Sequence, residues 1–240
     1  MKRTALPLSL LCLAAALTAC SADGEDNKET ADKPKASASV SASQAKQAGP
    51  AERVAQLLVT KAEAGDFSIA EPAANDALAK SQSALTSDKA DCAPLSYALN
   101  ELPIGTSEAS LVRVTNSAKG MVTYITLATY ATGKAEAAMQ GLTTAASTCR
   151  GGFTAKSSAG ATTYDSVTVE TAPADGDESL ATATTFTYRG ATQTLRTQTF
   201  RFGDTIANYF TLNSNAFLQG GPGNAEIPAA LVKAQNAKLA

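Results

Sequence analysis

The part of the chain after Gly152 constrains the fold most, because its strand-forming segments are joined by connections too short to cross a sheet. These segments are rich in Thr, Val, Ile, Tyr and Phe and span residues 153–157, 164–170, 180–189, 192–202 and 205–213. Residues 173–177, Gly190 and residues 203–204 separate them and favour turns. A parallel crossover needs about a dozen residues or more, so we expect antiparallel pairing.

The preceding part of the domain adds helices and a further pair of strands. Residues 111–116 and 121–131 are rich in Val, Ile, Thr and Tyr, and the short turn between them ends in Gly120. Apolar spacing and flanking Gly, Pro and Asp predict helices at residues 51–64, 72–80, 93–102, 133–149 and 225–239. The predicted fold class is therefore α+β, a twisted antiparallel sheet of about five to seven strands with helices packed on a face.

The N-terminal residues carry the three parts of an export signal. Lys2 and Arg3 precede an apolar run at residues 6–17, which is shorter than the roughly 20 residues that a membrane-spanning helix needs. The run ends in Leu-Thr-Ala-Cys at residues 17–20, which resembles the bacterial lipobox, whose cysteine receives diacylglycerol. We therefore predict cleavage before Cys20 and fatty acyl chains, such as palmitate, on that cysteine.

These features divide the chain into three parts. Residues 1–19 are the lipoprotein signal peptide; an ordinary signal peptide cleaved near Ala19 is the alternative. Residues 20–50 carry the lipidated cysteine and a Ser/Ala-rich tether with too few large apolar side chains for a core. Residues 51–240 suit a single extracytoplasmic domain. We expect this domain to be lipid-anchored through Cys20 at the outer face of the cell membrane.

The positions of the four cysteines predict their roles. Cys12 leaves with the signal peptide and Cys20 takes lipid, so Cys92 and Cys149 remain as a pair in an oxidising setting, where a disulfide is expected. Closing the long loop between them would stabilise the fold by about 4 kcal/mol. A zinc site is a poor alternative, because zinc takes four ligands and the chain has no histidine. We predict neither metal nor cofactor.

The order of the elements resembles a known family. A helix carrying Cys92, two strands, an Ala-rich helix ending at Cys149 and a meander containing RFGDTIANYF at residues 201–210 are similar to the extracellular sensor domains typified by the mycobacterial kinase PknH. That family includes actinobacterial lipoproteins, and the resemblance covers residues 54–232. It implies a twisted antiparallel sheet with helices around a cleft that binds an unidentified extracellular ligand. Family members carry two disulfides, whereas this domain can form only one.

The sequence lacks the motifs of common catalytic sites. Without histidine, the Ser-His-Asp and Cys-His arrangements are excluded. There is also no GxSxG motif and no phosphate-binding loop. Ser43 and Lys46 have Ser-x-x-Lys spacing, but they lie in the predicted tether without companion motifs. Asp175, Asp177 and Glu178 lack a full calcium loop and indicate an acidic turn. We predict that the protein is not an enzyme.

Basic and aromatic residues on predicted strands are candidates for ligand contacts. Arg113, Arg196 and Arg201 can bind carboxylate or phosphate with paired donors. The alternative is a solvated sheet face with cross-strand ion pairs. Tyr124 is a candidate as well, although tyrosine is favoured in strands simply for packing.

These observations favour a membrane-anchored, non-catalytic, sensor-like or ligand-binding lipoprotein. Its expected partners are the membrane and an unidentified small-molecule or cell-envelope ligand; the formal net charge of −2 does not indicate nucleic acid. A carrier of lipid or another hydrophobic ligand is one alternative and predicts a long apolar cavity. A structural or interaction protein of the envelope is another and predicts no cavity. An unrecognised hydrolase is the third.

Overall fold

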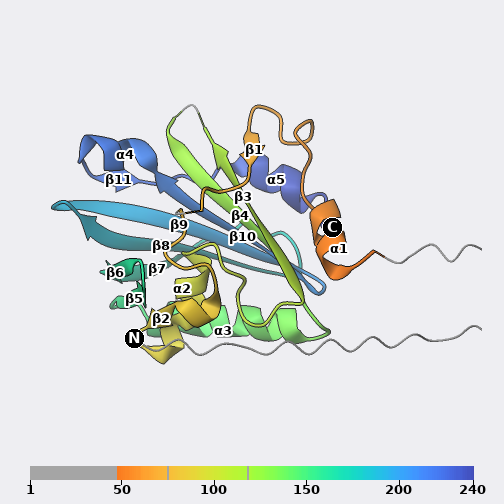
Figure 1. Ribbon diagram of the computed structural model, residues 1–240, viewed down its shortest axis with the longest axis horizontal. Coiled ribbons are helices and arrows are strands. Elements are labelled where there is room, and N and C mark those ends of the chain that lie inside the picture. Colours follow the sequence, from red (N-terminus) through yellow and green to blue (C-terminus); the bar gives the residue numbers. More distant parts are fainter. Residues whose placement is uncertain (1–47, 75, 118) are drawn as a thin grey trace, which may run out of the picture. The chain divides into compact units, whose positions relative to one another are not determined.

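The computed structural model describes residues 48–74, 76–117 and 119–240 (Figure 1). The predicted signal peptide, Cys20 and most of the predicted tether lie outside the described residues. The described residues form one compact unit. None of the helices within them is long and apolar enough to span a bilayer.

The described residues build an eight-stranded sheet and a smaller three-stranded sheet. In spatial order the main path is β1 (Ser68–Ala70), β3 (Ala109–Asn116), β4 (Met121–Thr129), β10 (Thr205–Asn213), β9 (Ala191–Phe202), β8 (Glu178–Tyr188) and β7 (Ser166–Glu170). Neighbours along this path pair antiparallel, as predicted. The short β11 (Gly223–Asn224) adds to β9 in parallel. The small sheet contains β2 (Thr86–Ser87), β5 (Phe153–Ser157) and β6 (Gly160–Tyr164).

Helices pack on both faces of the main sheet (Figure 1). The helices are α1 (Pro50–Gln56), α2 (Ala93–Ala98), α3 (Lys134–Thr148), α4 (Ser214–Gln219) and α5 (Ala229–Asn236), with 3-10 turns η1 (Gln82–Ala84) and η2 (Ala90–Cys92). α2 and α3 share one hydrophobic core with the sheet, and α1 and α5 share the other. We call these two sides the α2/α3 face and the α1/α5 face.

The alternation of side chains along β4 explains why both faces need a cover. Tyr124 and Ala128 belong to the core under α2 and α3, whereas Ile125 and Leu127 belong to the core under α1 and α5. All four are buried. Successive strand residues point to opposite faces, so a strand that is apolar at every position must be covered on both sides. Both faces of β4 are therefore apolar and both are covered.

Two predicted helices differ most from the structure. The helix expected at residues 51–64 ends at Gln56, because the side chain of Gln235 in α5 forms hydrogen bonds with the backbone that follows. The Gln235 amide donates to the Leu57 carbonyl at 2.7 Å and accepts from the Val59 N–H at 3.0 Å. The helix expected at residues 72–80 is absent from the described residues there, which form turns and bends. At the first of these places a tertiary contact overrides the local helical spacing.

The predicted disulfide between Cys92 and Cys149 is present, with Cα atoms 5.9 Å apart and both residues fully buried. It joins η2, which leads into α2, to the residue that follows α3. The bond therefore fastens together the two helices that cover the α2/α3 face.

Replacing both cysteines by alanine should lower the free energy of unfolding by about 3–4 kcal/mol, because the bridge closes a loop with a sequence separation of 57 residues. Urea denaturation of residues 48–240 measures this loss. Dithiothreitol should destabilise the wild-type domain and leave the double variant unchanged. Equal stability of the two proteins without reductant would contradict the expectation.

Candidate functional site

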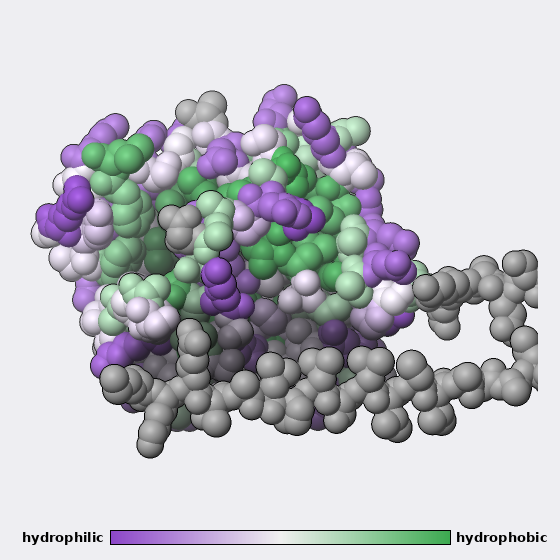
Figure 2. Space-filling model, in the orientation of Figure 1, coloured by the Kyte–Doolittle hydropathy of each residue, from purple (hydrophilic) through white to green (hydrophobic). Residues whose placement is uncertain are grey.

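A cavity of about 770 Å³ opens on the α2/α3 face beside the small sheet. Its walls come from the segment at residues 76–78, the turn after α2, strands β4, β6, β8, β9 and β10, and helix α4. Figure 2 shows a hollow with hydrophobic side chains between α4 and the β5–β6 hairpin. The volume lies in the range of small-molecule sites.

Aromatic rings make up much of the cavity wall. Tyr124 and Phe210, on the paired strands β4 and β10, stack with centroids 5.8 Å apart. Phe217 of α4 lies 5.9 Å from Phe186 and 5.2 Å from Tyr188, both on β8. These rings present apolar area with electron-rich faces.

The charged side chains that line the cavity, within the described part of the chain, are the carboxylates of Asp76, Glu101 and Asp165; neither lysine nor arginine is among the lining residues there. Glu101 is 6% exposed. Among the described residues its carboxylate has neither a hydrogen bond nor an ion pair at contact distance. Burial, and then the negative charge of Asp76, raise the pKa of Glu101 to about 7.

The turn after α2 holds Glu101 at this position. The backbone of Glu101 lies in the left-handed region with φ of 61°, a conformation that costs a non-glycine residue roughly 1 kcal/mol. Asn100 closes the helix by donating to the Ser96 carbonyl at 2.7 Å, and the Leu102 N–H donates to the Tyr97 carbonyl at 3.1 Å. These bonds and the burial of Leu102 compensate the strained backbone.

Two tyrosines of the cavity, Tyr124 and Tyr164, keep their protons at neutral pH. Burial raises the pKa of Tyr164 to about 12, and its hydroxyl accepts from the Asn100 amide at 3.4 Å. Burial, together with the charges of Glu101 and Asp76, raises the pKa of Tyr124 further. The phenols therefore supply neutral hydroxyls, and the formal charge of the described lining is negative.

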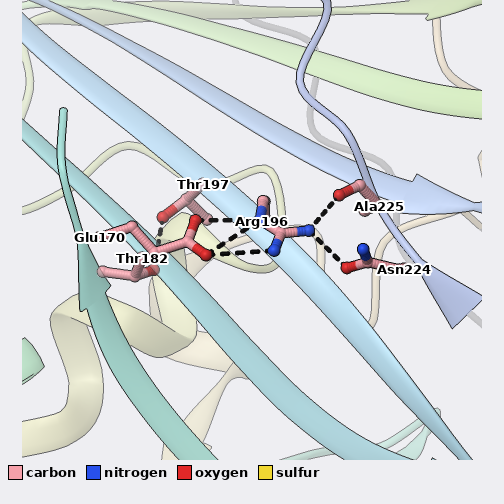
Figure 3. Close-up of polar contacts among 6 residues, drawn as sticks. All are labelled: Glu170, Thr182, Arg196, Thr197, Asn224 and Ala225. Atoms are coloured by element: carbon pink, nitrogen blue, oxygen red, sulfur yellow. Dashed lines mark hydrogen bonds and ion pairs between the residues drawn. The ribbon is translucent and has the colours of Figure 1, made fainter. Parts of the chain in front are cut away.

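Tyr124 is the one predicted ligand residue that lies in this cavity. Arg196 instead points to the α1/α5 face, where its Nε and Nη2 donate to the Glu170 carboxylate (Figure 3). Its Nη1 donates to the Asn224 side chain and to the Ala225 carbonyl. Figure 3 shows the guanidinium between β7 and the β11 segment, so this arginine fastens chain segments together.

The other two predicted arginines also form ion pairs. Arg201 donates to Glu178 at 2.9 Å and to Asp177 at 3.0 Å. Arg113 lies 3.5 Å from Glu71. Neither contributes to the lining of the cavity, and both match the cross-strand and surface ion pairs that were the alternative interpretation.

Sequence reasoning missed Glu101 because the predicted helix at residues 93–102 places it on a solvent-facing turn. The structure ends α2 at Ala98 and turns the chain, which brings Glu101 into the cavity. Its position between the apolar residues Leu99 and Leu102 was the available signal. Within the described residues, no group of three side chains is placed to hold a metal ion.

Comparisons with known proteins give a similar fold and no family match. No protein-family model matches the chain, and no curated protein matches it. The extracellular domain of PknH from Mycobacterium tuberculosis is similar, with a TM-score of 0.49 and 13% identity over 78% of this chain and 93% of that chain. An ortholog of Rv0999 from Mycobacterium smegmatis has a TM-score of 0.43 and 15% identity over 78% of this chain and 95% of that chain. The PknH domain that the sequence resembles is thus among the similar solved structures.

Glu101→Gln should stabilise the folded domain by about 2 kcal/mol at pH 8 and by much less at pH 5. A carboxyl whose folded pKa is about 7, against an ordinary 4.5, makes the folded state lose stability as the pH rises between these values. The amide has no such titration. Urea denaturation at the two pH values measures the difference.

Glu108→Gln is the matched control, because Glu108 is exposed and lies outside the cavity lining. It should show no pH-dependent gain. An equal effect of Glu101→Gln at pH 5 and pH 8 would contradict the assignment of a raised pKa to Glu101.

Proposed function

We propose that this protein is a lipid-anchored, extracytoplasmic lipoprotein whose domain binds a small-molecule ligand in the cavity and acts as a sensor-like, non-catalytic module. The observation that carries the proposal is the cavity itself. It combines aromatic walls with a buried carboxylate that has no partner among the described residues. A mostly apolar concave site with few, well-placed polar groups is the usual form of a ligand site.

The anchor is supported by the N-terminal sequence and by the chemistry of the fold. The export signal, the lipobox-like Leu-Thr-Ala-Cys at residues 17–20 and the Ser/Ala-rich segment after it follow the order of a bacterial lipoprotein. The buried Cys92–Cys149 disulfide fits an oxidising, extracytoplasmic compartment. Such an anchor and tether would present the domain at the outer face of the cell membrane.

The form of the cavity favours a small ligand with a polar part over a purely apolar one. A carrier of hydrophobic ligands would need a long apolar cavity, whereas Asp76, Glu101 and Asp165 line this one. Burying these carboxylates against an acyl chain would leave their charges unpaired at a cost of several kcal/mol.

The aromatic walls of the cavity should take up a small aromatic probe that carries an amine N–H, and Leu212→Trp should block it. Leu212 is half-buried on β10 and lines the cavity, so an indole there occupies the space of a ligand. We expect N-phenyl-1-naphthylamine to gain fluorescence with residues 48–240 at one-to-one stoichiometry. The variant should weaken binding by about tenfold or more, equivalent to about 1.4 kcal/mol.

Leu218→Trp is the matched control, because Leu218 is 82% exposed on α4 and is absent from the cavity lining. This variant should bind the probe like the wild type. Probe binding that both variants retain in full would place it outside the cavity and count against the proposed function.

Membrane attachment should depend on Cys20 alone. Cys20→Ser removes the acceptor of the diacylglycerol and should move the protein from the membrane fraction to the soluble fraction of the producing cells. Cys12→Ser, also within the N-terminal segment, is the matched control and should leave the protein with the membranes. Immunoblots of the fractions measure the distribution. Membrane retention of the Cys20 variant would contradict lipid anchoring at this residue.

A further inference from the structure

We propose that the cavity selects an organic cation, an ammonium group attached to an apolar body, with the ammonium group paired to Glu101. This inference rests on the proposed function and specifies the chemistry of the ligand. It follows from three features of the cavity: an unpartnered acid, a lining without cations among the described residues, and aromatic walls.

The burial of Glu101 without a partner is the first feature. Acidic side chains are almost never this buried unless they are paired, because a desolvated charge without a counter-ion costs several kcal/mol. Only 6% of Glu101 is exposed, it lines the cavity, and its carboxylate makes no hydrogen bond or ion pair with another described residue. A ligand cation would supply the missing counter-charge and a hydrogen-bond donor.

The distribution of charge around the cavity is the second feature. Asp76 and Asp165 add negative charge to the described lining. Two arginines that the sequence predicted as ligand contacts form ion pairs outside the cavity: Arg196 with Glu170, and Arg201 with Asp177 and Glu178. An anionic ligand would meet repulsion from like charges, whereas a cation would be attracted by all three acids.

The aromatic walls are the third feature. Cations bind over the electron-rich faces of aromatic rings, and sites lined by several rings suit substituted ammonium groups. The stacked Tyr124 and Phe210 and the cluster of Phe217 with Tyr188 border the cavity. One of these rings already forms a cation–π contact within the protein: the guanidinium carbon of Arg189 lies 5.2 Å from the centroid of the Tyr188 ring.

Choline and its neutral isostere 3,3-dimethyl-1-butanol form the test. The two probes have the same shape around the quaternary centre and differ in charge. Titration of residues 48–240, followed by the NMR signal of the probe methyl groups at pH 8, gives both dissociation constants. We expect choline to bind about tenfold more tightly than the isostere to the wild-type domain.

Glu101→Gln should abolish this preference, and Glu108→Gln should preserve it. Glu101→Gln keeps the size of the side chain and removes its charge, so the isostere should bind both proteins equally. Lowering the pH to 5 should weaken choline binding to the wild-type domain and leave the isostere unaffected, since a protonated Glu101 no longer attracts a cation. The groups that face Glu101 are Asp76, whose negative charge raises the pKa of Glu101, and Tyr124, whose phenol stays neutral.

Binding of N-phenyl-1-naphthylamine separates the failure of this inference from that of the proposed function. Urea denaturation shows that Glu101→Gln is folded, and the naphthylamine probe bound by the wild-type domain shows that the cavity is open. If choline and the isostere bind equally, or if choline binds Glu101→Gln as tightly as the wild type, the cation assignment is wrong while the ligand site stands. If neither choline nor the naphthylamine probe binds the wild-type domain, both proposals fail.

Discussion

The pairing of β4 with β10, in a sheet that is buried on both faces, is the constraint on which the rest of the structure depends. Apolar residues alternate to both sides of β4, so neither face can be left to water. Hydrogen bonds from β10 then hold the helices that cover the two faces. The Asn208 amide donates to the Ala98 carbonyl of α2 at 2.9 Å, and the Tyr209 hydroxyl donates to the Asn236 side chain of α5 at 2.6 Å. Neighbouring residues of one strand thus fasten a helix to each face.

The cavity lies where the cover of the α2/α3 face is incomplete. α2 and α3 pack over part of the sheet and are joined by the Cys92–Cys149 bridge, but the wall beyond them is made by the β5–β6 hairpin, residues 76–78 and α4. The hairpin begins shortly after Cys149, so the disulfide ties the helical cover to one wall of the cavity. Lys89 and Asp88 add contacts on the same side: the Lys89 ammonium donates to the Gly152 carbonyl, and the Thr154 N–H donates to the Asp88 carboxylate. The disulfide and these two hydrogen bonds therefore hold the wall of the cavity to the helical cover.

Glu101 links the stability of the domain to its proposed function. A buried carboxylate with a raised pKa lowers the stability of the folded state at neutral pH, and its left-handed backbone adds strain. Natural sites often retain such costs because the destabilised group gains most from a bound ligand. A ligand cation that pairs with Glu101 would recover the energy lost on burial, so the acid that weakens the empty domain would contribute selectivity to the occupied one.

The sequence by itself determined most of the strand segments, their antiparallel pairing and the disulfide, because strand periodicity, short turns and the count of available cysteines are local or compositional properties. It did not predict the short strands β1, β2, β6 and β11. Tertiary structure alone decided what happens to residues whose neighbours come from distant segments. Gln235 ends α1 early, and the turn after α2 moves Glu101 from an expected helix surface into the cavity. The chemistry of Arg196 also predicted a ligand contact, but the fold places Glu170 beside it and the two side chains form an ion pair. The sequence fixes the type of each residue, but long-range contacts decide which partner it meets. Those contacts decide whether an arginine or a glutamate forms a structural ion pair or stays available to a ligand, and local patterns do not encode them.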